Sequence, residues 1–116
     1  MHYPVEIALR GIPPSSALER YIAEEARKLD GICERIVSCQ AVAEGLQREK
    51  QQGAQFAVRL IITLPGTEVV VNREHGDDVY MAVRDAFAAA GLQLEDHMRR
   101  HSIESHSRNG APDSRS

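Results

Sequence analysis

Hydrophobic and polar residues alternate along several short stretches of the chain. Within 5–9 every second residue is aliphatic, and the same two-residue period recurs over 36–44 and 55–64. A Val-rich stretch follows at 68–72. This alternation is typical of a strand that buries one face. We therefore predict a strand in each of these stretches; the inward residues of the second would be Val37, Cys39, Ala41 and Ala43.

A helical period follows the first predicted strand. Ser16 and Glu19 have the S-x-x-E spacing of a capping box, which predicts that a helix begins there. Asp30 and Gly31 would end this helix, with Gly31 in the left-handed conformation that favours glycine. The apolar stripe of the helix consists of Leu18, Tyr21, Ile22, Ala26 and Leu29.

A second helix is predicted after Asp77 and Asp78, whose carboxylates suit a helix N-terminus. Gly91 lies inside it, at a cost of about 1 kcal/mol relative to Ala. We expect the helix to end near Arg100 and the polar residues 102–116 to form a disordered tail. Its core stripe consists of Val83, Phe87, Ala90 and Leu94, extended by Val79 and Met98.

Turn signals connect these elements. Pro65 and Gly66 predict a type II turn, so 55–72 should form a hairpin. The polar segment 45–54 predicts a loop. The resulting order is β-α-β-β-β-α, which predicts an α+β fold: a four-stranded sheet with two helices packed on one face. We predict one domain over 1–101, followed by the tail.

The composition limits the possible functions. The chain has 116 residues, no Trp and a formal net charge of −3, which disfavours a simple polyanion binder but allows a local basic patch. Cys33 and Cys39 form no C-x-x-C motif, so we interpret them as buried thiols. We find neither a signal peptide nor an apolar stretch of roughly 18 residues. These features predict a cytoplasmic protein without membrane contact.

No motif in the chain predicts an enzyme. We find no nucleophile elbow, P-loop or G-x-G-x-x-G, and therefore expect no catalytic residue, cofactor or small-molecule substrate. His97 and His101 are one helical turn apart, with Glu104 beyond them, a spacing that could hold a metal. Because no third ligand is secured, we predict no metal site.

Three short motifs resemble a known family. They are Arg-Lys-Leu-Asp at 27–30, Glu-Arg-Ile at 34–36 and Asp-Val-Tyr-Met-Ala-Val at 78–83. Together, over about residues 3–101, the chain resembles the short ribosome hibernation promoting factors and ribosome-associated inhibitors, the sigma-54 modulation protein family. The resemblance implies a fold similar to double-stranded-RNA-binding folds. It also implies docking on the small ribosomal subunit and its ribosomal RNA near the decoding region, which idles ribosomes under stress.

The sequence departs from this family in its charge. Relatives usually end the second helix in a Lys-rich stretch, whereas 88–96 here contains no basic residue. Glu25 stands where relatives often have Lys. Fewer phosphate contacts predict weaker binding with a flatter salt dependence. Longer relatives also carry a C-terminal domain that pairs ribosomes, for which we expect this chain to be too short.

The resemblance selects a set of candidate RNA-binding residues on the helices and near the helix end. They are Arg20, Arg27, Lys28, Arg35, Arg84, Arg99 and Arg100. Intrahelical pairing of Glu24 with Arg20 or Lys28 is an alternative role, as is stabilisation of the helix C-terminus by Arg99 and Arg100.

Other conspicuous side chains have simpler interpretations. We interpret Tyr80 as a partly buried packing residue, and Arg10 and Arg59 as residues of the solvated face of the sheet.

Two functions follow from the sequence. The first is a non-enzymatic factor that binds the small ribosomal subunit and blocks translation by occlusion. The second is a protein-interaction or homodimeric stress module of the same fold that has lost tight ribosome binding. An exposed strand edge would favour the second, because edges invite pairing.

Overall fold

The computed structural model describes residues 3–46, 55–76 and 78–109, with side chains as far as Arg100. The predicted order of strands and helices is confirmed. The elements are β1 (Val5–Arg10), α1 (Ser16–Lys28), the 3₁₀ turn η1 (Leu29–Gly31), β2 (Ser38–Leu46), β3 (Gln55–Leu64), β4 (Thr67–His75) and α2 (Val79–Asn109). Of the predicted loop, 45 and 46 belong to β2, and 47–54 lie outside the described residues.

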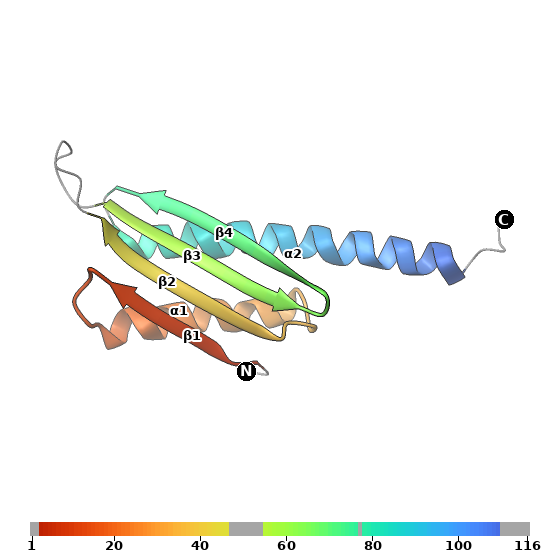
Figure 1. Cartoon of the computed structure of the whole chain (residues 1–116), viewed down its shortest axis with the longest axis horizontal. Helices are drawn as coiled ribbons and strands as arrows, with labels where there is room; N and C mark the ends of the chain where they lie inside the picture. The colour runs from red at the N-terminus through yellow and green to blue at the C-terminus, as the bar shows by residue number, and fades with distance from the viewer. Residues whose placement is uncertain (1–2, 47–54, 77, 110–116) are drawn as a thin grey trace.

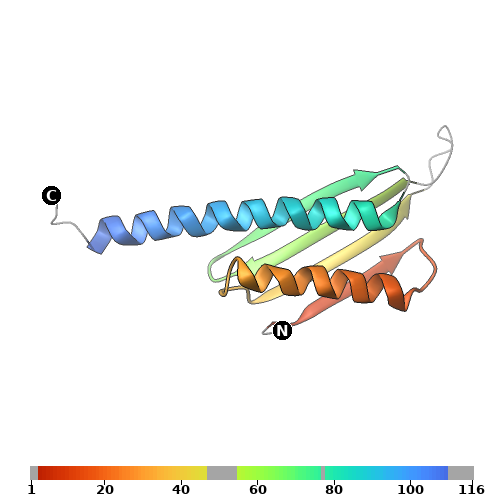
Figure 2. The ribbon, with the colours of Figure 1, turned by 180° about the vertical axis from the view of Figure 1, so that it is seen from behind.

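The four strands form one mixed sheet in the order β1-β2-β3-β4 (Figure 1). β1 pairs with β2 in parallel, so the chain must cross over between them, and α1 lies in that crossover. The strands β2, β3 and β4 form an antiparallel meander. Seen from behind, both helices cover the same face of the sheet (Figure 2). The predicted α+β architecture is therefore confirmed.

The helix-covered face of the sheet forms the core. Buried residues alternate along β2 and β3 as the sequence predicted, and the α2 stripe packs against them with every member at most 4% exposed. Val37 is the exception: it is 50% exposed, because it precedes β2 and lies outside the alternation. The buried side chains of β2, β3 and the α2 stripe are Cys39, Ala41, Ala43, Val58, Leu60, Ile62, Leu64, Val83, Phe87, Ala90 and Leu94.

The start of α1 differs from the prediction by one residue. Ser15 is the N-cap, with its Oγ accepting the Leu18 N–H at 3.1 Å, and Ser16 is the first helical residue. The predicted capping box of Ser16 and Glu19 is therefore wrong. Both serines are chemically able to cap, and the extended backbone at Ser15 (φ −146°) decides between them.

The end of α1 also differs from the prediction. The chain tightens into η1, where the N–H groups of Ile32 and Cys33 both donate to the Leu29 carbonyl at 3.0 Å. Gly31 does not adopt the predicted left-handed conformation; among the described glycines only Gly11 and Gly66 have positive φ. The value at Gly66, +79°, agrees with the predicted type II turn.

α2 begins as predicted but continues further. The Asp78 carboxylate accepts the Tyr80 N–H at 2.9 Å and caps the helix, whereas Asp77 lies outside the described residues. The expected end near Arg100 is wrong, because α2 continues to Asn109. A helix once formed gains a hydrogen bond with each added residue, and the first breakers after Gly91 are Gly110 and Pro112.

The second half of α2 projects beyond the sheet (Figures 1 and 2). Met98 is the last described side chain of α2 that packs against the core. The helical residues 102–109 were expected in the disordered tail, and 110–116 lie outside the described residues. Among the described residues, no helix is both long and apolar enough to cross a membrane.

Candidate nucleic-acid interface

A groove of about 290 Å³ runs between α1 and α2, and we call it the inter-helix groove. The two helices run in the same direction, side by side (Figure 2). Gly91 of α2 leaves space for the side chain of Ile32, which follows η1, since a Cβ there would lie 3.2 Å from the Ile32 Cδ1. The groove is lined by Glu25, Lys28, Leu29, Ile32, Arg84, Phe87, Ala88, Gly91, Leu92 and Glu95. Its floor is apolar and its rims carry charges of both signs.

Two aromatic rings connect the same helices. The centroids of Tyr21 and Tyr80 are 5.2 Å apart, with the ring planes tilted by 53°. Tyr80 is 39% exposed, which agrees with the predicted role of a partly buried packing residue. Burial, assisted by Glu25, raises the pKa of the Tyr21 hydroxyl, while Arg84 and Lys28 act in the opposite direction. Arg84 follows Tyr80 by one helical turn and Lys28 follows Tyr21 by two, so both cations come after the aromatic pair along their helices.

Lys28 is held on the rim of the inter-helix groove. Its Nζ lies 2.8 Å from the Glu25 Oε2, one helical turn back, and not against Glu24 as expected. This hydrogen bond raises the pKa of Lys28 above its ordinary value. The side chain is 73% exposed, so it can turn toward another anion.

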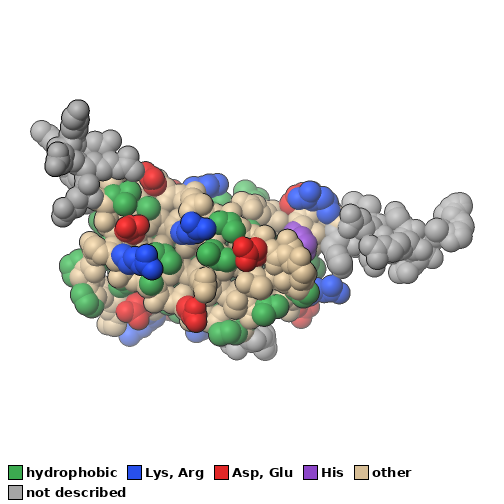
Figure 3. All heavy atoms as spheres, viewed as in Figure 1, with side chains coloured by type: hydrophobic (Ala, Val, Ile, Leu, Met, Phe, Trp, Pro, Cys, Tyr) green, Lys and Arg blue, Asp and Glu red, His purple; other side chains and the backbone are tan. Residues whose placement is uncertain are grey.

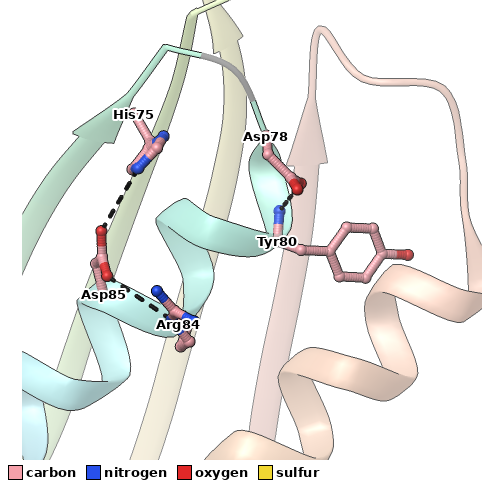
Figure 4. Close-up of polar contacts among 5 residues, drawn as sticks. All are labelled: His75, Asp78, Tyr80, Arg84 and Asp85. Atoms are coloured by element: carbon pink, nitrogen blue, oxygen red, sulfur yellow. Dashed lines mark hydrogen bonds and ion pairs between the residues drawn. The ribbon is translucent and has the colours of Figure 1, made fainter.

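Arg84 and Asp85 on α2 and His75 on β4 form a series of long polar contacts (Figure 4). The Arg84 Nε lies 4.0 Å from the Asp85 Oδ1, and the His75 Nε2 lies 3.9 Å from the Asp85 Oδ2. Both distances are at the limit of an ion pair, and the Arg84 side chain is 59% exposed. The attraction between Arg84 and Asp85 is therefore weakened by solvent.

Arg20 and Arg27 lie on the outer side of α1. They are two turns apart and both exposed, while the core side of the helix carries Leu18, Ile22 and Ala26. Within the described part of the chain neither arginine forms an ion pair, so the predicted pairing of Arg20 with Glu24 is not found. Arg35 is exposed in the connection from η1 to β2, before the strand it was expected to begin.

Arg99 and Arg100 lie apart from the other candidates. Both pair with Asp96, through an Arg100–Asp96 hydrogen bond and an Arg99 Nη1–Asp96 Oδ1 distance of 4.0 Å. Arg100 lines a second groove of about 380 Å³, between α2 and β4. Because α2 continues to Asn109, the proposed stabilisation of its C-terminus by these residues is wrong.

The seven predicted basic residues therefore do not converge on one site. Only Lys28 and Arg84 share the inter-helix groove; the others occupy the outer side of α1, the η1–β2 connection and the far part of α2. Tyr21 was predicted only as part of the apolar stripe, and its role in the cluster was missed. The signal was its position seven residues before Lys28, on the same side of the helix.

The open face of the sheet carries no concentrated positive charge. It shows basic, acidic and hydrophobic side chains intermixed (Figure 3). Arg10 and Arg59 are exposed, as expected, and on β1 and β2 the side chains of Glu6 and Gln40 are hydrogen-bonded at 3.1 Å. The side of the sheet seen in Figure 3 therefore offers no concentrated surface for phosphate.

The other candidate metal ligands and the two cysteines lie apart from the groove residues named above. Among the described residues no three His, Cys, Asp or Glu side chains are grouped to hold a metal ion, and the His101 side chain lies outside them. Cys33 and Cys39 are buried and free, as predicted. Burial raises the pKa of the Cys39 thiol to about 11, so it remains protonated at neutral pH.

The sequence matches the family described as "Sigma 54 modulation protein / S30EA ribosomal protein" over residues 5–102. The chain belongs to this family. The match covers the sheet, α1 and most of α2, and the predicted resemblance is thereby confirmed. Comparison with curated proteins gave no match.

Two solved structures share the fold of this family member. A ribosomal subunit interface protein from Coxiella burnetii is 18% identical, with a TM-score of 0.67 over 83% of this chain and 98% of its own. The N-terminal domain of Protein Y from Thermus thermophilus is 20% identical, with a TM-score of 0.64 over 79% of this chain and 94% of its own. At these identities the likeness concerns the fold.

Proposed function

We propose that this protein binds the small ribosomal subunit near the decoding region and idles ribosomes under stress. It acts in the cytoplasm by occupying a site on ribosomal RNA, without catalysing a reaction. The observation that carries the proposal is the family match over residues 5–102. The shared fold with a ribosomal subunit interface protein supports it.

The helical side of the molecule is the proposed contact surface. It carries the inter-helix groove with Lys28 and Arg84, and the exposed Arg20 and Arg27 on α1. Arginine guanidinium groups suit bidentate contacts with phosphate oxygens. Arg35 in the connection from η1 to β2, and Arg99 and Arg100 on α2, extend the surface toward the end of the molecule from which α2 projects (Figure 2).

Local ion pairs modulate this surface. Lys28 is bonded to Glu25, and Arg99 and Arg100 share Asp96. On binding, these cations must exchange a carboxylate for a phosphate, so each contributes less than an unpaired cation. We therefore expect moderate affinity that decreases as the salt concentration rises, because binding phosphate releases counterions.

Cosedimentation with purified small ribosomal subunits at low and moderate salt tests the proposal. The protein should pellet with the subunit at low salt and less completely at moderate salt. Absence from the subunit at both salt concentrations would exclude this function.

A protein-interaction or homodimeric module is the second candidate, and the edge strand β4 favours it. β4 is the last strand of the sheet, so its outer backbone groups have no strand partner among the described residues. Val70 on β4 and Leu92 on α2 are exposed and border the same groove, which Glu68, Asp96 and Arg100 also line.

Sedimentation equilibrium of the purified chain separates the two candidates. A dimer that dissociates when Val70 is replaced by Lys, in a protein that does not bind the small subunit, would support the second candidate. A monomer that binds the subunit would exclude it.

A further inference from the structure

Tyr80 packs against Tyr21 and keeps part of its ring exposed. Its ring extends from α2 toward α1 (Figure 4) and contacts Tyr21 at a centroid distance of 5.2 Å. It nevertheless remains 39% exposed, whereas Val83 and Phe87, the apolar residues that follow it on α2, are at most 4% exposed. Part of an aromatic ring is therefore accessible on α2 one helical turn before Arg84, which lines the inter-helix groove.

Two cations line the inter-helix groove, whose first residue on α2 follows Tyr80 by one helical turn. Arg84 is one helical turn after Tyr80 and lines the groove, and Lys28 lines it from α1. They come from the two helices that the Tyr21–Tyr80 contact joins. Proteins bind unpaired nucleotides with an exposed aromatic ring beside Arg and Lys. The base stacks on the ring, and the phosphate binds to the cations.

Two of the acidic residues nearby are already engaged, whereas Glu95 also lines the groove. Glu25 is bonded to Lys28 at 2.8 Å, and Asp78 accepts the Tyr80 N–H at 2.9 Å as the helix cap. Arg84 has only the distant Asp85 contact at 4.0 Å, with both side chains more than 40% exposed. Arg84 is therefore the cation of this cluster that can take a phosphate with least competition.

The groove beyond the ring has room for a nucleotide. Ala88 and Gly91 leave it hollow, and Leu29 and Ile32 provide an apolar floor. We propose that an unpaired base of RNA stacks on Tyr80 and that Arg84 and Lys28 hold the adjacent phosphate. This inference rests on the proposed function and names the part of the RNA that the groove accepts: nucleotides outside a duplex, because a paired base presents no free face to the ring.

Two substitutions at one position separate stacking from packing. Tyr80→Leu keeps apolar volume against Tyr21 but removes the aromatic face, and Tyr80→Phe keeps the face and removes only the hydroxyl group. Thermal unfolding of both variants shows whether the fold is retained. The binding partner in the assay is the purified small ribosomal subunit, titrated with labelled full-length protein.

We expect Tyr80→Phe to bind within about twofold of the wild type and Tyr80→Leu to bind about tenfold more weakly, the usual loss for one stacked base. Arg84→Gln should also weaken binding and should reduce the slope of log affinity against log salt by about one. Tyr80→Leu should leave that slope unchanged, because it removes no charge.

Each outcome has a distinct meaning. If the wild type and a folded Tyr80→Leu variant bind the subunit with equal affinity, the stacking inference is overturned and the proposed function is left intact. If Tyr80→Leu does not fold, the other two variants decide. The stacking inference is overturned if Tyr80→Phe and Arg84→Gln lose the same affinity and neither changes the slope of log affinity against log salt. Failure of the wild type to bind the subunit would overturn the proposed function, and the inference with it.

Discussion

Gly11 has a backbone conformation that other residues rarely adopt. Its φ is +65°, and a Cβ added there would lie 2.8 Å from the Gly45 carbonyl oxygen of β2. Strain and steric conflict should therefore make Gly11→Ala less stable by about 2 kcal/mol or more in the free energy of unfolding. Gly31→Ala is the matched control, because its φ is not positive and no atom lies within 4 Å of the added Cβ. Urea unfolding of the two variants should show a loss in the first only; equal stabilities would contradict the close approach of the two backbones.

The Cys39 thiol makes stability depend on pH. Burial raises its pKa from 9.0 to about 11 in the folded protein, so the folded state holds this proton more tightly than the unfolded chain. The corresponding stability is fully present below about pH 9 and is lost as the pH rises toward 11, by up to about 3 kcal/mol. The buried Tyr3 hydroxyl, whose pKa is also raised, acts in the same direction at higher pH.

Chemical unfolding at several pH values tests this linkage. The free energy of unfolding should decrease between pH 9 and 11 in the wild type and decrease less steeply in Cys39→Ala. Identical slopes in the two proteins would show that the thiol is not responsible.

Among the elements, α1 depends on one specific cap. The Ser15 Oγ accepts the Leu18 N–H at 3.1 Å, whereas Ser16 is exposed in the first turn. Ser15→Ala should cost about 1 kcal/mol of stability and Ser16→Ala close to nothing. Thermal unfolding of both variants checks this, and a larger loss at Ser16 would restore the capping box predicted from the sequence.

The elements also show what the sequence could and could not predict. The strands and the core stripe of α2 follow from local alternation and spacing, which the sheet and its covering helices preserve. The end of α2 was misplaced because its last turns leave the core, so apolar spacing no longer marks them. The start of α1 was misplaced because Ser15 and Ser16 are equally good caps in sequence, and only the backbone conformation separates them.

At the scale of the whole molecule, the basic residues could be selected from the sequence but not their arrangement. Arg20 and Lys28 are on the same helix, yet one faces outward and the other lines the inter-helix groove. Which side of α1 meets α2 depends on the parallel packing of the two helices on the sheet. The same packing places Tyr21 against Tyr80, 59 positions apart in the chain. No local sequence pattern predicts this contact.

Opposite faces of the molecule offer a matched test of the proposed contact surface. Arg20 and Arg27 are exposed on the helical side, and Arg10 and Arg59 are exposed on the open face of the sheet. Replacing either pair by Glu changes the net charge equally. A difference between the two double variants therefore reports on position and not on overall charge.

The affinity of these two double variants for the purified small ribosomal subunit is the most direct test of the account. We predict that Arg20→Glu with Arg27→Glu weakens binding by about tenfold or more and flattens its salt dependence, because phosphate contacts are lost. Arg10→Glu with Arg59→Glu should bind within about threefold of the wild type, since only the weak long-range attraction changes. Equal losses in both variants, or a larger loss for the sheet-face pair, would contradict binding through the helical side.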